Sequence, residues 1–306
     1  MNLSKIQNIL QIMKFDRPIR SAAQFHREED GSAYDVWKLE TDAGAAVLKM
    51  ISPQEREVWQ TFFLYGAPGT PEVYGLAEHE GQNYLLMEFF AGETLSQADR
   101  SHWQRALDAL IAMQNAFWQN TEQAGAGWTF EKKFASEQRW LPYMDDLAEA
   151  YRAYLTEVAR VPRTLCNDDL LPFNVLVNEE RAVILDWEYG GILPYPCALA
   201  RLLAFGEEGT DFFFRMSQAD RDFALRYYYD HLLREKEIPW EEYLRTMQLF
   251  SLKEYAEWVY LARKEKDLSG VNYRKYYEKC KILAAELGFS APCGKREIAT
   301  LPPCES

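Results

Sequence analysis

The sequence predicts an α+β protein of two lobes, a small antiparallel sheet followed by a larger and mostly helical part. Two observations carry this prediction. Between residues 33 and 90, short apolar segments alternate with turns, as in hairpins, whereas after about residue 95 apolar residues recur at helical spacing. With 306 residues, 48% of them hydrophobic, each lobe can bury a core. We place the lobes at residues 1–92 and 93–306.

Charge and cysteine content narrow the class of protein. The formal net charge of −13 disfavours a nucleic-acid binder and an anionic-membrane binder, which would need a basic face. It is compatible with a cationic substrate, although a solvated acidic surface explains it equally well. The five cysteines form no C-x-x-C pair, and no apolar run reaches about 18 residues. We therefore expect a cytoplasmic protein without a disulfide framework or a membrane span.

The elements of the first lobe can be placed in order. Apolar residues from Leu3 to Met13 have helical spacing and predict a helix that packs on this lobe. Strands are predicted at 33–40 and 45–50, joined by a turn at 41–44, and a second hairpin at 72–77 and 84–90. Between the hairpins, Ser52 and Pro53 predict a helix start, because serine caps helices and proline suits the first turn.

Helices dominate the prediction for the second lobe. We expect them at about 95–118, 137–159, 219–233, 240–264 and 273–287. The tail from residue 290 reads as irregular because of its prolines.

The stretch from Leu165 to Glu188 holds the strongest chemical signal. A polar loop with Asp169 and Asn174 precedes two short apolar runs, and Asp186 follows the second run. The pattern predicts a hairpin that holds these three side chains around one point. Asp169 could accept the proton of an attacking hydroxyl, and Asn174 and Asp186 offer the oxygen ligands that Mg²⁺ prefers. Taken singly, each residue is more typical of a cap, a turn or a strand start, and it is the joint pattern with both apolar runs that favours a catalytic site.

This stretch resembles one known family. The segment from Asn167 to Asn174 resembles the H-G-D-x-x-P-x-N loop of the aminoglycoside phosphotransferase and choline kinase family, and Leu185-Asp186-Trp187-Glu188 resembles its I-D-W/F-E motif. The resemblance implies a protein-kinase-like fold and an ATP- and Mg²⁺-dependent transfer of phosphate to a small-molecule hydroxyl. It is strongest between residues 165 and 205. It also implies a helix that begins near Leu193, because the segment from Leu193 to Leu203 is similar to the family's D-P-x-x-D-L-A-x-L helix.

The resemblance also implies roles in the first lobe. Lys49, between apolar neighbours near a strand end, resembles the lysine that holds the nucleotide phosphates, although an edge lysine in solvent is the alternative. Glu57 is our candidate for the ion pair that orients Lys49, and Glu55 is the second choice. Met87, Glu88 and Phe90 resemble the interlobe hinge, where backbone groups of Glu88 and Phe90 would bind adenine and Met87 would line the pocket. A core methionine is an equal alternative for Met87.

The acceptor implied by the resemblance is an amine-bearing molecule, such as an aminoglycoside-like antibiotic, or choline or another amino alcohol. Acidic residues of the second lobe are candidates to meet its positive charge, and Tyr255 and Trp258 are candidates to stack on it. These acids are Glu188, Glu207, Glu208, Asp211, Glu254 and Glu257.

Two positions depart from the family pattern. Asn167 stands where the family has histidine, and Ala198 stands where the family has aspartate before Leu-Ala. We expect that Asn167 bonds to local backbone and rebuilds the support of the loop. A catalytically silent, kinase-like binding or structural protein is the alternative function.

Overall fold

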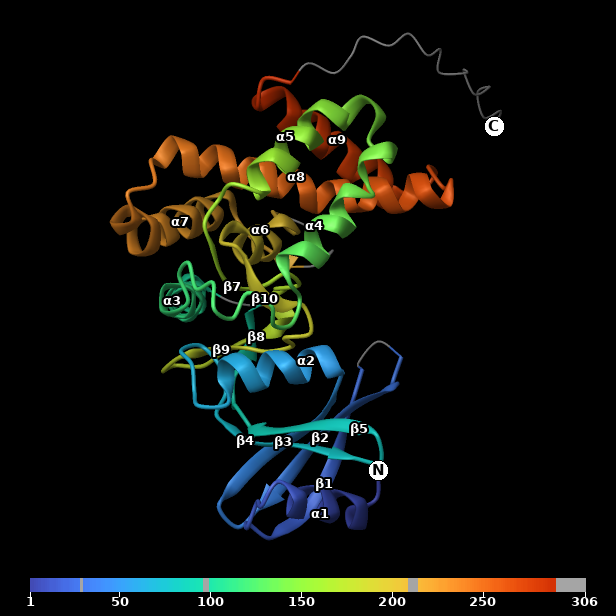
Figure 1. The fold of residues 1–306 in the computed structure, drawn as a ribbon, viewed down its shortest axis with the longest axis vertical. Helices are drawn as coiled ribbons and strands as arrows, with labels where there is room; N and C mark the ends of the chain where they lie inside the picture. The colour runs from blue at the N-terminus through green and yellow to red at the C-terminus, as the bar shows by residue number, and fades with distance from the viewer. Residues whose placement is uncertain (28–29, 96–98, 209–213, 290–306) are drawn as a thin grey trace.

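The computed structural model describes residues 1–27, 30–95, 99–208 and 214–289. A sheet forms one end of the molecule and a group of helices forms the other, with α2 and the short strands β8 and β9 between them (Figure 1). The predicted α+β class and two-part arrangement are confirmed. The division between residues 92 and 93 remains a prediction.

The first part is built on a five-stranded antiparallel sheet with the order β1-β2-β3-β5-β4. Four strands match the predicted hairpins, and β1 was not predicted, because its sequence lacks a clear apolar alternation. The strands are β1 (Ile19–His26), β2 (Ala33–Thr41), β3 (Gly44–Ile51), β4 (Val73–His79) and β5 (Gln82–Glu88).

The two faces of this sheet have different partners. Helix α1 (Leu3–Ile12) covers one face, as predicted, and packs there against side chains that include Leu48. Val47 and Ile51 face the other side, toward α2 (Pro53–Val58) and the helical part. Because side chains alternate along a strand, Lys49 points to the same side as Val47 and Ile51. The strand therefore aims Lys49 at the interior between the two parts.

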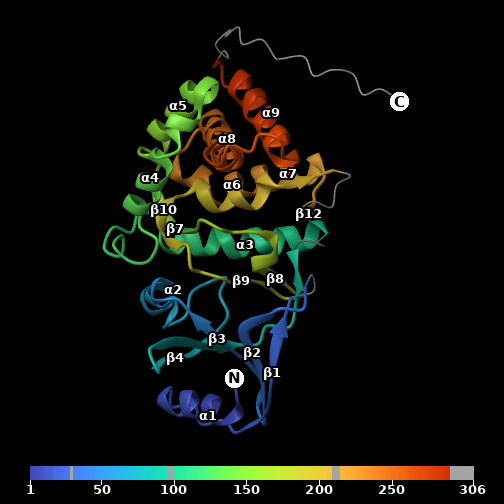
Figure 2. The ribbon, with the colours of Figure 1, turned by 90° about the vertical axis from the view of Figure 1, so that its right-hand side faces the viewer.

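Seven α-helices make up most of the second part as far as the structure describes it. Helix α8 lies at its centre, next to α5, α6 and α9 (Figure 2). These helices are α3 (Arg100–Ala116), α4 (Phe130–Gln138), α5 (Ala148–Val158), α6 (Pro196–Ala204), α7 (Gln218–Tyr228), α8 (Trp240–Glu265) and α9 (Val271–Glu286).

One predicted helix, at 137–159, is wrong as a single element. It divides into the end of α4, two 3-10 turns at Leu141–Tyr143 and Asp145–Leu147, and α5. Pro142 lies at the break, and proline has no amide hydrogen to continue an α-helix.

Short strands connect the parts around the polar loop. The predicted hairpin is confirmed as β8 (Val175–Val177) and β9 (Ala182–Ile184), and β6 (Glu93–Thr94) pairs with β8. Two further strands, β7 (Arg163–Asn167) and β10 (Gly190–Pro194), were not predicted; the helix expected near Leu193 begins only at Pro196. Since β10 pairs with β7 and places Gly190 opposite Asn167, both ends of the loop region meet at one point. A small parallel pair, β11 (Gly206–Glu207) with β12 (Phe214–Arg215), lies near α7.

Candidate active site

The loop between β7 and β8 positions Asp169 and Asn174. A 3-10 turn at Pro172–Asn174 closes the loop, and the Asn174 amide Nδ2 donates a 3.1 Å hydrogen bond to the Asp169 carbonyl. This bond fixes the Asn174 side chain through its nitrogen and leaves its oxygen available as a ligand.

Asn167 connects this loop to the segment that carries Asp186. Its Nδ2 donates to the carbonyls of Leu185 (3.3 Å) and Asp186 (2.9 Å), and its Oδ1 accepts a 3.0 Å bond from the Asp169 amide. Asn167 is only 1% exposed. The expectation that Asn167 bonds to local backbone is therefore confirmed, and these bonds hold the Asp169 and Asp186 segments together.

Lys49 joins the sheet to this loop region. Its ammonium donates to both carboxylate oxygens of Glu55 (2.7 and 2.9 Å) and to Asp186 Oδ1 (2.8 Å). Burial alone would lower the pKa of Lys49, but the carboxylates of Glu55 and Asp186 raise it above its usual value. Lys49 therefore stays protonated, with the carboxylates of Glu55 and Asp186 as its partners.

The expected ion pair between Lys49 and Glu57 is wrong, and Glu55 is the partner. Glu55 is 3% exposed and is held by Trp59, whose Nε1 donates to its Oε1 at 3.2 Å. Glu57 is exposed on α2. Because consecutive helical residues are rotated by about 100°, a residue two positions further on faces away from the sheet.

Arg201 of α6 holds the side chain of Asp169. Its Nε and Nη2 donate to Asp169 Oδ1 at 3.1 and 2.7 Å, while its Nη1 reaches Glu254 (2.9 Å) and Glu257 (3.2 Å) on α8. Burial raises the pKa of Asp169 above its usual value, and Arg201 opposes this rise. Asp169 is thus a partly desolvated carboxylate, fixed in orientation beside an open space.

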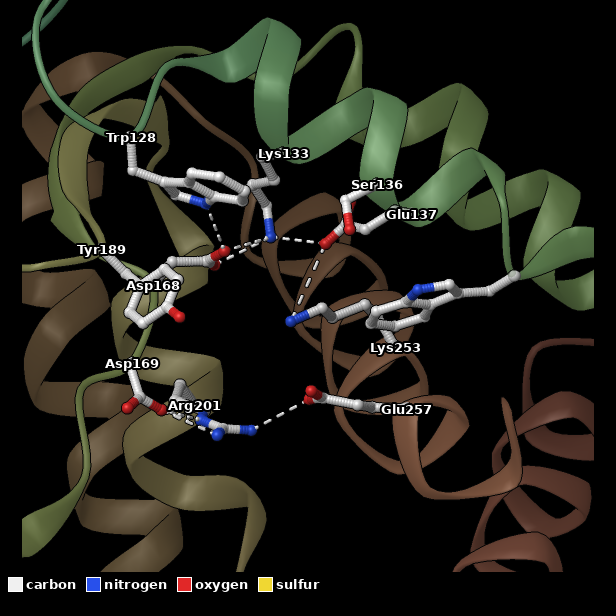
Figure 3. A pocket seen from close by; sticks show the side chains of 11 residues that line it. Trp128, Lys133, Ser136, Glu137, Asp168, Asp169, Tyr189, Arg201, Lys253 and Glu257 are labelled. Carbon is white, nitrogen blue, oxygen red and sulfur yellow. Dashed lines mark hydrogen bonds and ion pairs between the residues drawn. The ribbon is translucent and has the colours of Figure 1, made fainter. Parts of the chain in front are cut away.

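That open space is a cavity of about 440 Å³ between the loop and the helices α4, α6 and α8 (Figure 3). Its wall combines aromatic rings, lysines, arginine and carboxylates. The lining residues are Trp128, Lys133, Ser136, Glu137, Trp140, Asp168, Asp169, Tyr189, Arg201, Lys253 and Glu257. Sequence reasoning identified only Asp169 and Glu257 among them.

Glycine at the start of β10 places Trp128 on this wall. The Trp128 amide donates to the Gly190 carbonyl at 2.8 Å, and a Cβ on Gly191 would lie 2.3 Å from the Trp128 carbonyl oxygen. Only glycine permits this approach. From there, Trp128 Nε1 donates to Asp168 Oδ2 at 3.2 Å.

A buried ion-pair cluster forms the far wall of the cavity. Lys133 Nζ bonds to Glu137 Oε1 (2.5 Å) and to both oxygens of Asp168 (2.8 and 3.0 Å). Burial alone would raise the pKa of Asp168, but the Lys133 ammonium holds it well below its usual range. The spacing of Lys133 and Glu137, four residues apart on a helix, is a signal that sequence analysis could have used.

The predicted hinge residues lie at the end of β5. Met87 is 6% exposed and pairs with Val47, so its side chain lies on the face that Lys49 shares. The Glu88 carboxylate binds Arg181 at 2.6 and 2.7 Å, and the Arg181 guanidinium lies 5.1 Å from the centre of the Phe90 ring. Adenine binding by the Glu88 and Phe90 backbone remains a prediction.

Several other residues that the sequence analysis proposed to contact the acceptor are bound to other side chains or lie outside the described residues. Glu207 binds Lys275 and Lys279, and Tyr255 and Trp258 both stack on Tyr276. Asp211 and the tail from residue 290 lie outside the described residues. No described helix has the length and apolar character needed to cross a membrane.

Comparison with known proteins gives a family match. The profile of a family described as "Phosphotransferase enzyme family" matches residues 26–231. Among proteins with curated descriptions, no match was found.

Solved structures show the same fold. The chain is similar to a choline kinase from Cryptosporidium parvum (TM-score 0.61, 15% identity, 93% of this chain and 97% of that chain). It is equally similar to a choline/ethanolamine kinase family protein from Mesorhizobium loti (TM-score 0.61, 15% identity, 93% and 96%). An aminoglycoside phosphotransferase in ternary complex with ADP and hygromycin B has a TM-score of 0.57 and 15% identity, with 96% and 100% covered. The protein-kinase-like fold is thereby confirmed.

Proposed function

The chain belongs to the phosphotransferase enzyme family, and from that premise we propose that it transfers the γ-phosphoryl group of ATP to a hydroxyl of a small molecule. One observation carries this proposal: Lys49 bonds to both Glu55 and Asp186, and Asn167 ties the backbone of Asp186 to that of Asp169. The candidate phosphate-binding cation, the candidate metal-ligand carboxylate and the candidate base are thus held in one connected unit.

In the proposed step, Asp169 orients the acceptor hydroxyl and takes its proton. The acceptor oxygen forms a bond to the γ-phosphorus, and the bond from that phosphorus to the bridging oxygen breaks, so ADP leaves with the electron pair. Lys49 would hold the phosphates by charge. Positioning and charge neutralisation supply most of the rate enhancement in such transfers.

The side chains fit a Mg²⁺ ion bound together with the nucleotide. Asp186 and Asn174 would hold it through oxygen atoms, and Mg²⁺ commonly takes one or two protein carboxylates plus substrate phosphates. No group of three or more histidine, cysteine, aspartate or glutamate residues that could hold a metal occurs in the described parts of the chain. When bound, the ion would neutralise charge on the phosphates.

The acceptor is a small polar molecule in this proposal, because the cavity beside Asp169 is about 440 Å³ and carries many charged groups. The sequence expectation of an amine-bearing acceptor, aminoglycoside-like or an amino alcohol such as choline, draws support from the aromatic side chains of Trp128, Trp140 and Tyr189 on the cavity wall. Aromatic faces attract ammonium groups.

The alternative of a catalytically silent protein rested on Asn167 and Ala198. The bonds of Asn167 to the Asp169 and Asp186 segments weaken that alternative, because the loop keeps its support without the family histidine. Ala198 is fully buried in α6, where it packs in the core.

A nucleotide-consumption assay with Mg²⁺-ATP and a panel of hydroxyl compounds tests the proposal, with isothermal calorimetry of Mg²⁺-ATP binding beside it. We expect an acceptor-dependent turnover that Asp169→Ala abolishes while it leaves nucleotide binding intact. Binding of Mg²⁺-ATP without turnover of any compound would favour the silent protein. Absence of both binding and turnover would overturn the proposal.

A further inference from the structure

Two buried lysines face the cavity beside Asp169, and neither belongs to the nucleotide site. Lys133 on α4 is 1% exposed and Lys253 on α8 is 4% exposed. Figure 3 shows the Lys253 ammonium pointing into the cavity, between Lys133 and Arg201. Buried ammonium groups are costly unless they are paired, so their place on a cavity wall requires an explanation.

The carboxylates of this wall already have cationic partners. Each of two cations binds two of these carboxylates: Arg201 binds Asp169 and Glu257, and Lys133 binds Asp168 and Glu137. An incoming ammonium group would therefore share each carboxylate with an internal cation that already binds it. Carboxylates that are paired in this way attract a cationic acceptor less strongly than free carboxylates would.

Lys253 differs from Lys133 in how many of its donors are used. Lys133 makes three hydrogen bonds, which account for its three N–H groups. Lys253 makes one, to Glu254 Oε1 at 3.0 Å, and Glu137 Oε1 lies 3.8 Å away, beyond hydrogen-bond distance. Among the contacts that the described residues make, Lys253 thus retains donor capacity toward the cavity.

Lys253 stays protonated although it is buried. Burial alone would lower the pKa of Lys253, but the Glu254 carboxylate raises it above its usual value. Lys253 also lies 5.7 Å from the centre of the Trp140 ring, so one side of its ammonium meets an aromatic face. The group is a fixed, protonated donor rather than a neutral amine.

We propose that the acceptor carries an anionic group, a carboxylate or a phosphate, which Lys253 binds while the acceptor hydroxyl meets Asp169. This inference rests on the proposed phosphotransferase function and names its substrate class. Charge-assisted hydrogen bonds to a carboxylate or phosphate would use the free donors of Lys253, with the cations of Lys133 and Arg201 flanking the anion. An amine on the same molecule is compatible with the aromatic wall, and the acceptor would then be zwitterionic.

The test uses four acceptors of similar size: a hexuronate, a hexose phosphate, a hexosamine and a neutral hexose. The full chain, the variant Lys253→Met and the control Lys264→Met are compared in nucleotide consumption with Mg²⁺-ATP. Methionine keeps the apolar stem of lysine without its charge, and Lys264 is an exposed lysine on the same helix. Calorimetry of Mg²⁺-ATP binding and a thermal melt confirm that each variant is folded.

We expect wild-type enzyme to prefer an anionic member of the set. Lys253→Met should raise the KM for that member by at least about 30-fold, because an unpaired buried charge is costly, while the affinity for Mg²⁺-ATP and the kinetics of Lys264→Met stay unchanged. The hexuronate and the hexose phosphate distinguish a carboxylate from a phosphate group.

Other outcomes separate the two proposals. Turnover of the hexosamine or neutral hexose, equal in wild type and Lys253→Met, overturns the anion site and leaves the phosphotransferase function standing. If no compound is turned over, binding of the hexuronate and the hexose phosphate is followed by tryptophan fluorescence, since Trp128 and Trp140 line the cavity. Saturable binding that Lys253→Met abolishes supports the anion site, and absence of binding overturns it.

Discussion

Arg201 donates two hydrogen bonds to one oxygen of Asp169, Oδ1, and none of the described residues donates a hydrogen bond to Oδ2. The guanidinium thus fixes the carboxylate and leaves one oxygen for an acceptor hydroxyl. Glu254 and Glu257 hold Arg201 from the opposite side. The candidate base is therefore oriented by α6 and, through Arg201, by α8.

Arg201→Gln should change the pH dependence of turnover. Burial raises the pKa of Asp169 and the Arg201 cation opposes this, so loss of the cation raises the pKa further. A base works only when deprotonated; the acid limb of kcat/KM should therefore move to higher pH, by about one unit or more. The pH–rate profile measures this shift. Arg226→Gln, at an exposed arginine of α7, is the control, and an unmoved acid limb in Arg201→Gln would contradict the role given to Arg201.

Asp169→Asn should remove the base and preserve the shape of the site. We expect kcat to fall by about two to four orders of magnitude, the range of general-base contributions, while the dissociation constant of Mg²⁺-ATP stays close to that of wild type. Steady-state kinetics and calorimetry measure the two quantities. Asp145→Asn, at an exposed aspartate, serves as the control. Comparable kcat values in Asp169→Asn and wild type would exclude Asp169 as the base.

Glu55→Gln and Glu57→Gln form a matched pair on one helix. Glu55 binds the Lys49 ammonium with both oxygens, whereas Glu57 is exposed. Loss of a buried charge-assisted bond costs about 1.5–3 kcal/mol, so kcat/KM for ATP should fall by about ten- to a hundredfold in Glu55→Gln only. Kinetics with ATP as the varied substrate show which glutamate supports Lys49. An effect of Glu57→Gln as large as that of Glu55→Gln would refute the assignment of Glu55 as the partner of Lys49.

The choice between Glu55 and Glu57 shows what sequence could predict here. Ser52 and Pro53 indicate where α2 begins, but the face of a six-residue helix that meets the sheet depends on tertiary packing. The polar loop and its hairpin were predictable, because their residues are close in sequence and the apolar runs fix the strands. Strand β1 carries no such pattern and was missed.

The cavity was beyond sequence reasoning for the same physical reason. Lys133, Arg201 and Lys253 come from three helices, α4, α6 and α8, and only the packing of these helices brings them together. In sequence each resembles an ordinary surface cation. Only Lys133 had a local signal, its spacing from Glu137, and that signal also fits an exposed helical ion pair.

Lys133→Met should destabilise the fold. It would leave the carboxylates of Asp168 and Glu137 without their main cation in a buried setting, which costs about 3–5 kcal/mol. Urea unfolding measures the loss. The double variant Lys133→Met/Asp168→Asn should recover part of it, because one buried charge is then removed, and Lys132→Met, at an exposed neighbour, should have little effect. A single variant as stable as wild type would show that the cluster contributes no net stability.

Asn167→Ala and Asn167→Asp test the link between the two halves of the site. Alanine removes all three side-chain hydrogen bonds of Asn167. Aspartate can still accept from the Asp169 amide, but it places a negative oxygen against the carbonyls of Leu185 and Asp186, where Nδ2 now donates. Unsatisfied buried carbonyls cost about 1–3 kcal/mol each, and a repelled carbonyl costs more.

Both variants should therefore displace the Asp186 segment relative to Asp169. We expect kcat to fall by about tenfold in Asn167→Ala, the equivalent of one such bond, and further in Asn167→Asp, with a higher Mg²⁺ concentration needed for half-maximal rate. Magnesium titrations of the steady-state rate measure both effects, and Asn115→Asp, exposed on α3, is the control. If Asn167→Asp were as active as wild type, the bonds to the Leu185 and Asp186 carbonyls could not be what supports the loop. Only the bond to the Asp169 amide, which aspartate keeps, would then remain for that role.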